Sequence, residues 1–208
     1  MGALLYTVIG DLVGSRRSAD RAGLQDRLDE VLREVSGRVP VAQPFEPTVG
    51  DEFQGACATL SEALTAALLV RLGLLPLVDA RCGLGHGEVS VHDAARAPLL
   101  QDGPGWWAAR EAIDAIGGPR DDRRTWFLGE GSDTINAFLV CRDQVISRLN
   151  ERGVRMLRLA LLGHSQKEIA EHEEVWPSAV SQQFRRGIGA VVQAHALVAA
   201  AGPPPGHP

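Results

Sequence analysis

The chain has 208 residues, of which 45% are hydrophobic and 23% charged, so it is long enough to bury one full core and a smaller second one. Its formal net charge of -5 argues against a protein that coats nucleic acid without sequence preference, although that charge is compatible with a local basic face. The N-terminal sequence has no basic flank before Asp11, and no apolar run reaches membrane-spanning length. We therefore expect a cytoplasmic protein with no signal peptide and no contact with a membrane.

The three cysteines are Cys57, Cys82 and Cys141. All lie in apolar runs, and none forms a CxxC pair. An odd number without metal-ligand spacing favours reduced thiols in the core over disulfides or a zinc site.

The first 130 residues alternate between strand-like and helix-like segments. An apolar strand ends at Asp11, an amphipathic helix follows, and two short strands flank the triplet Gly50-Asp51-Glu52. A second apolar helix spans 60–74, a strand spans 78–91, and a further helix runs from 103 to 116. The order β-α-β-β-α-β predicts an α+β fold with a ferredoxin-like antiparallel sheet, whose helices cover one face and leave the other open.

After residue 150 the pattern is purely helical, and the last eight residues are mostly proline and glycine. We expect a sheet domain over residues 1–130, a helical domain over 131–200 and a disordered tail over 201–208.

Two carboxylates fall where strands of this sheet end. Asp11 ends the first strand, and Asp51 lies in the hairpin between the two inner strands. Carboxylates that converge from adjacent strand ends suit Mg²⁺, and a pair of them can bridge two ions for phosphoryl chemistry. The plain alternative for Asp51 is turn chemistry, because Asp commonly caps a hairpin.

The residues around these carboxylates suggest a phosphate. Gly14 permits a turn, the backbone N–H groups near Ser15 are placed to cradle a phosphate, and Arg16 or Arg17 supplies the counter-charge. These parts suit a metal-bound nucleotide. The predicted ligand-binding set is completed by Gly50, Glu52 and Arg110. Glu52 is a third metal ligand, a group that supports the ligands from behind, or a solvated turn residue, and the sequence does not distinguish these.

Three glycines, Gly83, Gly85 and Gly87, share one face of the strand at 78–91. Glycine in a strand often marks a bulge or the close approach of a ligand. His86 between them is expected to be a half-exposed strand residue and not a catalytic base.

The segments "YTVIGDLVGSR" and "TVGDEFQGA" resemble the paired signatures of the SatD family of bacterial proteins over most of residues 4–90. They are similar, more distantly, to the palm domain of class III nucleotide cyclases, which has an Asp after the first strand, Gly-Asp in a hairpin and Arg-x-Gly-x-x-x-Gly-Glu in a strand. Here these positions hold Asp11, Gly50-Asp51 and the stretch from Arg81 to Glu88. "GDEF" is also similar to the signature of diguanylate cyclases, which share the palm. The resemblance implies that Asp11 and Asp51 are the metal ligands.

The chain departs from the cyclase pattern at two positions. The cyclases hold ribose and transition-state charge with an Asn-x-x-x-Arg pair, but here Trp106 precedes Arg110 at that spacing. Pro47 stands where the cyclases place a purine-reading Lys. Because uniform binding does not accelerate a reaction, a palm without these groups is expected to bind a nucleotide without cyclising it.

The segment from 163 to 189 has helix-turn-helix signals. Ser165 and Glu168 form a capping box that opens a short helix, with Ile169 and Ala170 facing inward. Pro177 suits the first position of a second helix. The buried stripe of that second helix is predicted at Val180, Phe184 and Ile188.

The opposite face of the second helix is polar and cationic. Its side chains are of the kinds that contact bases and phosphates, and the predicted DNA-binding residues are Ser178, Ser181, Gln182, Arg185 and Arg186. The segment resembles the helix-turn-helix of sigma factors and response regulators, except that Glu173 and Glu174 stand where a buried Leu and a turn Gly are usual. The alternative is a helical hairpin that packs on the sheet domain or on a partner chain.

We therefore expect a transcriptional regulator whose sheet domain senses a purine nucleotide, with Mg²⁺ at Asp11 and Asp51, and whose C-terminal helices bind DNA as a homodimer. The alternative is a metal-dependent nucleotide-converting enzyme in which Arg110 stabilises phosphate charge and the helical segment only dimerises.

Overall fold

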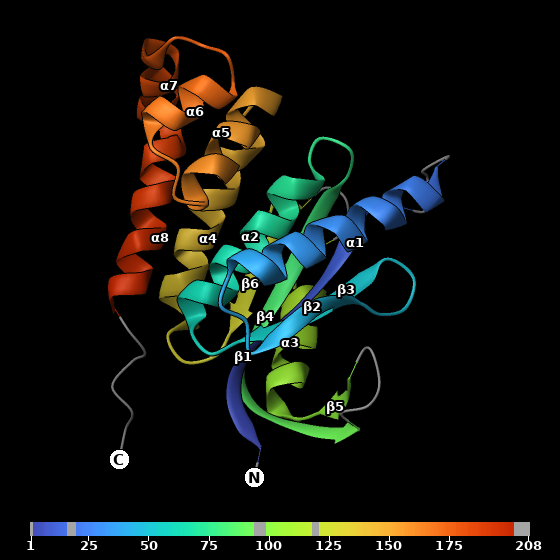
Figure 1. The fold of residues 1–208 in the computed structure, drawn as a ribbon. Coiled ribbons are helices and arrows are strands. Elements are labelled where there is room, and N and C mark those ends of the chain that lie inside the picture. Colours follow the sequence, from blue (N-terminus) through green and yellow to red (C-terminus); the bar gives the residue numbers. More distant parts are fainter. Residues whose placement is uncertain (1, 16–19, 94–98, 118–120, 202–208) are drawn as a thin grey trace.

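The computed structural model of the chain describes residues 2–15, 20–93, 99–117 and 121–201 (Figure 1). Arg16 and residues 202–208 lie outside this part of the chain, so neither the predicted phosphate contact nor the predicted tail is described. The strands are β1 (Ala3–Val13), β2 (Gln43–Pro47), β3 (Glu52–Cys57), β4 (Asp79–Asp93), β5 (Leu100–Asp102) and β6 (Thr125–Leu128).

Helices alternate with the strands and then follow them. The helices are α1 (Arg21–Arg38), α2 (Leu60–Leu74), α3 (Pro104–Asp114), α4 (Ser132–Ser147), α5 (Glu151–Leu161), α6 (Gln166–His172), α7 (Pro177–Gln183), the π-helical turn η2 (Phe184–Ile188) and α8 (Gly189–Ala201). The fold is therefore α+β, as predicted.

The strands form one mixed sheet in the order β2-β3-β1-β4-β5, with β6 also paired to β4. The prediction of a purely antiparallel sheet was wrong, because β6 runs parallel to β4 over Cys82–Gly85. β4 is 15 residues long, so one half pairs with β6 while the other half pairs antiparallel with β5. Both additional strands are short, at three and four residues, and carry little pattern of their own.

One face of the sheet packs on α1 and α2. Because side chains alternate along a strand, Tyr6, Val8 and Leu12 of β1 all point to this face, and all three are buried. The predicted apolar stripe of α1 covers them, with Leu24, Leu28, Val31, Leu32 and Val35 buried.

The other face is covered by α3, which corrects the expectation of an open surface. Ile9 of β1 packs there with Trp106, Ala109 and Ile113 of α3. A Cβ on Gly83 would lie 2.3 Å from backbone atoms of α3, so the absence of side chains at the glycines of β4 allows the helix to pack closely on the strand. The close approach that these glycines predicted is therefore made by α3.

The C-terminal helices pack directly on α2. Leu68 and Leu72 of α2 share a buried cluster with residues of α4 to α8, while other faces of α2 belong to the core of the sheet. Figure 1 shows α4–α8 gathered along one side of the sheet. An ion pair between Arg158 of α5 and Glu34 of α1 adds a second link. α2 thus connects the two parts of the chain through its side chains.

Several smaller expectations can be checked here. Cys57 and Cys82 are buried, but Cys141 is exposed on α4, so the prediction of three core thiols was wrong for one of them. His86 is half-buried and stacks on Tyr6 with ring centroids 4.2 Å apart. Among the described helices, none is long and apolar enough to span a membrane.

His195 of α8 is buried against Phe138, and burial lowers its pKa to about 3, with a smaller contribution from the charge of Arg142. An unfolded histidine titrates near pH 6.5, so below that pH the unfolded chain binds a proton that the folded chain does not. Stability is therefore lost as pH falls from about 6.5 towards 3, and we expect about 2 kcal/mol of this loss between about pH 7 and pH 5.

Urea unfolding of the wild type and of His195→Gln at both pH values checks this expectation. The neutral glutamine should remove about 2 kcal/mol of the pH dependence. Equal pH dependence in both proteins would mean that His195 binds a proton over the same pH range in the folded and the unfolded chain.

Candidate functional site

Three charged residues form one row across the sheet. Asp11 on β1 lies opposite Glu52 on β3 and opposite Arg81 on β4. Arg81 donates from Nε and Nη2 to the two carboxylate oxygens of Asp11, at 2.7 Å each. Its Nη1 also donates to the carbonyl oxygens of Ile116 and Gly117, at 3.1 and 3.3 Å. The bond to Asp11 raises the pKa of Arg81, while burial opposes this effect, so Arg81 is a fixed cation in the row.

Arg110 reaches the same row from α3. It donates from Nη1 and Nη2 to the two oxygens of Glu52, at 3.0 and 2.8 Å. The bond to Glu52 raises the pKa of Arg110. The side chains of Arg110 and Glu52 are 45% and 34% exposed, so solvent screens this pair and its net contribution to stability is about 0–1 kcal/mol. A ligand anion could therefore replace Glu52 at Arg110 at little cost.

Two glycine turns flank the row. Gly14 and Gly50 have φ of 75° and 73°, which is the left-handed conformation that glycine adopts without strain. Backbone conformation and not lack of space favours glycine here, because a Cβ at either position would meet no described atom within 4 Å. Between them, Ser15 is buried and its hydroxyl donates to Asp51 Oδ2.

The structure thus brings together the predicted residues Asp11, Ser15, Asp51, Glu52 and Arg110. It adds Arg81, which begins the Arg-x-Gly-x-x-x-Gly-Glu stretch and for which no role was predicted. Strand alternation was the available signal, because Arg81 shares a face with Gly83 and lies opposite the end of β1. Asp114 on α3 was also missed, and its charge acts on both arginines.

The predicted Mg²⁺ site fits these residues only in part. Both oxygens of Asp11 already accept from Arg81, and one oxygen of Asp51 accepts from Ser15. Within the described part of the chain, no group of three or more His, Cys, Asp and Glu side chains is placed to hold a metal ion. A cation at Asp11 would have to displace Arg81, and an anion at either arginine would have to displace a carboxylate.

The C-terminal helices form a second candidate region. Ser165 and Glu168 make the predicted capping box, in which each residue's backbone N–H donates to the other's side chain, at 2.7 and 3.3 Å. Pro177 is the first residue of α7. Ile169, Ala170, Val180 and Ile188 are buried as predicted, whereas Phe184 is only half-buried.

The two glutamates between α6 and α7 have defined roles. Glu173 occupies a buried position, with a side chain only 7% exposed, and accepts from Nε and Nη2 of Arg155 at 2.9 and 2.7 Å. Glu174 has φ of 52°, the left-handed conformation that a turn glycine would supply. The turn geometry is therefore kept despite both departures from the usual sequence.

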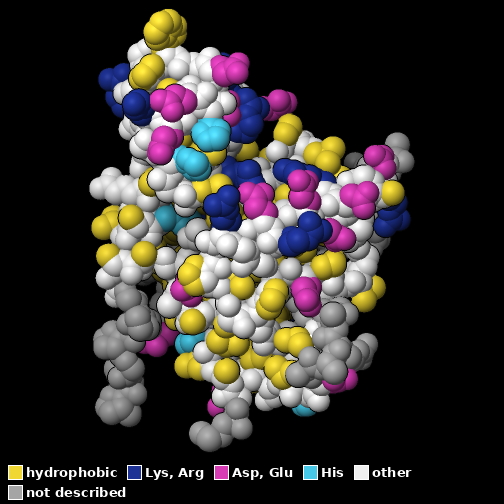
Figure 2. Space-filling model, in the orientation of Figure 1, with side chains coloured by type: hydrophobic (Ala, Val, Ile, Leu, Met, Phe, Trp, Pro, Cys, Tyr) yellow, Lys and Arg dark blue, Asp and Glu magenta, His cyan; other side chains and the backbone are white. Residues whose placement is uncertain are grey.

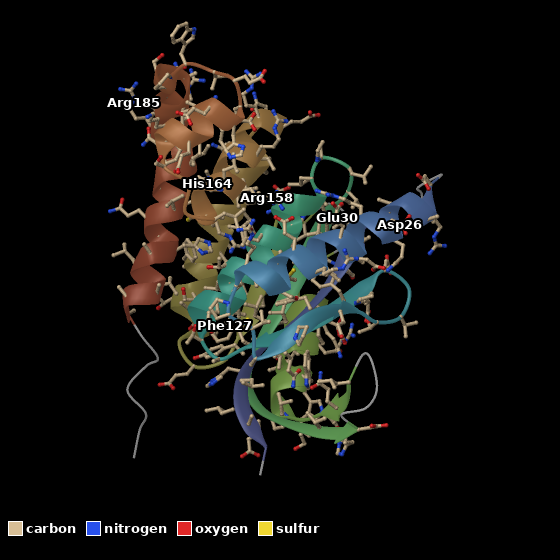
Figure 3. All side chains as sticks on the ribbon, viewed as in Figure 1. Asp26, Glu30, Phe127, Arg158, His164 and Arg185 are labelled. Carbon is tan, nitrogen blue, oxygen red and sulfur yellow. The ribbon has the colours of Figure 1, made fainter. Side chains whose placement is uncertain are left out.

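The outer side of α7 and η2 is exposed. Ser178, Gln182, Arg185 and Arg186 are exposed and Ser181 is half-buried. Within the described residues, none of these five side chains makes a hydrogen bond or ion pair, so all are free to contact a partner. Figure 3 shows Arg185 pointing away from the other helices.

The chain is thus an α+β protein with a charged cluster at one end of a mixed sheet and a helical C-terminal region. The model of the SatD family matches residues 5–192, so the protein belongs to the SatD family. No curated protein matches the chain.

Proposed function

We propose that this protein is a cytoplasmic DNA-binding transcriptional regulator whose N-terminal sheet domain binds a purine nucleotide. The observation that carries the proposal is the free polar and cationic face formed by α7 and η2. Its members are Ser178, Ser181, Gln182, Arg185 and Arg186, and no described residue pairs with them. A helix fixed by its buried side and free on the other presents such groups to the major groove.

The arrangement of α6 and α7 supports a helix-turn-helix. Ile169 and Val180 belong to the same buried cluster, and the intervening turn has its left-handed residue at Glu174. Because Arg155 neutralises Glu173, the turn adds less negative charge near DNA than its sequence suggests. Acidic and basic side chains are mixed both along α1 and over the C-terminal helices in the face seen in Figure 2, so DNA binding would depend on local contacts and not on a field of one sign.

The sheet supports the nucleotide-binding part of the proposal. The order β2-β3-β1-β4, with helices after β1 and β3, corresponds to the split βαβ arrangement of ferredoxin-like palms. A nucleotide phosphate would take the place of Glu52 at Arg110, while Arg81 stays fixed by Asp11. Mg²⁺ at Asp11 and Asp51 stays a prediction, and the nucleotide titration tests it by adding or omitting Mg²⁺.

The shared packing of α2 gives the nucleotide a route to the DNA-binding helices. Ligand binding changes DNA affinity only when it favours one arrangement of the two parts over the other. Helix-turn-helix proteins commonly bind DNA as dimers to half-sites about one helical turn apart, so we propose a homodimer.

The test starts with selection of duplex DNA from a random pool by the full-length protein. Affinity for the enriched duplex is then measured by fluorescence anisotropy at fixed salt. Arg185→Ala should weaken binding by about tenfold or more, since a base or phosphate contact by arginine is worth about 1–3 kcal/mol. Arg33→Ala is the matched control, because Arg33 is exposed on α1 and has no bonded partner within the described residues. No enrichment, or equal loss in both variants, would refute the proposal.

The same anisotropy titration tests whether nucleotide binding by the sheet domain changes the affinity for DNA. Nucleoside triphosphates and cyclic nucleotides, each with and without Mg²⁺, are added to the protein–DNA complex and checked for conversion by chromatography. Asp51→Asn should change the response to nucleotide and leave the affinity of the ligand-free protein for DNA largely intact. Product formed by the wild type but not by Asp51→Asn would favour the alternative, a nucleotide-converting enzyme.

A further inference from the structure

A pocket of about 410 Å³ opens between the α4–α5 junction and the end of α7. This volume lies within the range of small-ligand sites, about 300–1,000 Å³. Its lining consists of Val145, Arg148, Leu149, Asn150, Gln183 and Arg186. The pocket is formed entirely by the C-terminal helical region and is separate from the charged row at β1.

The lining carries two cations that no described group neutralises. Neither Arg148 nor Arg186 has a hydrogen bond or ion pair with any described residue, and the described lining contains no carboxylate. Other arginines of the same helices are paired, as Arg155 is with Glu173 and Arg158 with Glu34. Two unpaired guanidinium groups in one concave site favour an anionic occupant.

Two amide side chains add hydrogen-bond donors. Asn150 uses its Oδ1 to accept from the backbone N–H of Gly153 at 2.9 Å, which leaves its amide N–H groups free. Gln183 has no hydrogen bond to a described residue. Val145 and Leu149 supply apolar lining next to these donors. The combination suits a phosphate group attached to a small, partly apolar body.

We propose that this pocket binds a small phosphorylated ligand through Arg148 and Arg186, with Asn150 and Gln183 as additional donors. The ligand would touch the helical turn that follows α7. That turn, η2, is kinked at Gly187, which has φ of 146° and packs so closely on Val145 that a Cβ would lie 2.7 Å from it. An occupant of the pocket would therefore fix the position of α7 relative to α4.

The probe for the experiment is pyrophosphate, added to the full-length protein against sodium chloride at matched ionic strength. At about one hundred times its dissociation constant, pyrophosphate should raise the unfolding temperature by about 5 °C or more. Arg148→Ala should weaken binding by about tenfold or more in calorimetry, because one charge-assisted contact is lost. Arg33→Ala, which removes an equally exposed and unpaired arginine from α1, should bind as the wild type does.

Gln183→Glu gives an independent variant, because it keeps the shape of the side chain and places a carboxylate in the lining. It should also lose pyrophosphate binding, while the unfolding temperature without ligand shows that the variant is folded. No shift beyond that of chloride, or normal binding by both Arg148→Ala and Gln183→Glu, would overturn the proposal. So would a result in which Arg148→Ala impairs duplex DNA binding but pyrophosphate never binds, since the phosphate would then be that of the DNA backbone. Arg186 also belongs to the proposed DNA-binding face, so the test relies on Arg148 and Gln183, which do not.

Discussion

Replacing Asp143 with alanine is expected to lower the free energy of unfolding by about 3–5 kcal/mol, because it removes one partner from a buried charge network. Asp143 is 1% exposed and its Oδ2 accepts from the backbone N–H groups of Arg124 and Thr125 at 2.8 Å each. Its Oδ1 accepts from Arg142 Nη2 at 3.0 Å and from Arg71 Nη1 at 3.4 Å. The substitution would leave two N–H groups without an acceptor and Arg142 as an unpaired buried cation.

Urea unfolding followed by circular dichroism measures this loss. Asp133→Ala is the matched control on the same helix, because Asp133 is exposed in the first turn of α4 and contributes at most about 1 kcal/mol through the helix dipole. Asp143→Asn should fall between the two, since it keeps an oxygen acceptor but loses the charge. A loss for Asp143→Ala no larger than that for Asp133→Ala would contradict the expectation.

This network was not predicted from the sequence, and the reason is physical. Charged residues are usually solvated, so Arg142 and Asp143 give no apolar signal of burial. The available signal was their position between Leu139 and Ile146, on the stripe of α4 that faces the core. Their partners on α2 and β6 are far away in sequence, and only the fold brings them together.

Local signals were sufficient elsewhere. The bounds of α2 are those predicted, and Ser165 and Pro177 open their helices as predicted. Each of these features depends on residues within a few positions of one another, so tertiary structure is not needed to recognise it. The positive φ of Gly14 and Gly50 is likewise a local feature, because glycine itself favours that conformation.

Only part of the candidate site was predicted from the sequence. The strand order predicted that Asp11 and the Gly50-Asp51-Glu52 turn lie at one end of the sheet. It did not predict that Asp11 and Glu52 each pair with an arginine. Glu173 is a similar case, because its partner Arg155 lies 18 positions earlier on another helix. A carboxylate in an unusual position indicates that a cationic side chain lies near it, but the sequence alone does not identify that side chain.

The glycines of β4 have the same limitation. Gly83 indicated that something approaches the sheet closely, but a missing side chain does not distinguish a ligand from a helix. The approaching group is the backbone of α3, with the carbonyl oxygen of Ala109 and the nitrogen of Ile113 each 2.3 Å from the place of a Cβ. A carbon atom cannot occupy that space unless α3 moves away from the sheet.

Gly83→Ala is therefore expected to lower the free energy of unfolding by about 2–3 kcal/mol, through overpacking against rigid backbone. Gly37→Ala is the matched control. Gly37 lies in the last turn of α1, where an added Cβ would meet no described atom within 4 Å, so alanine should stabilise the helix by up to about 1 kcal/mol. The same chemical change should thus have opposite signs at the two positions in urea unfolding.

The Gly83→Ala protein should also report the movement of α3 through its tryptophans. Trp106 lies on the buried side of α3 and is 7% exposed, so displacement of the helix should shift its fluorescence emission to longer wavelength, whereas Gly37→Ala should leave the emission unchanged. Because Arg110 reaches Glu52 from α3, the same movement should weaken any response of the protein to nucleotide. Equal stability of Gly83→Ala and the wild type, with unshifted emission, would mean that α3 does not pack on β4 in solution.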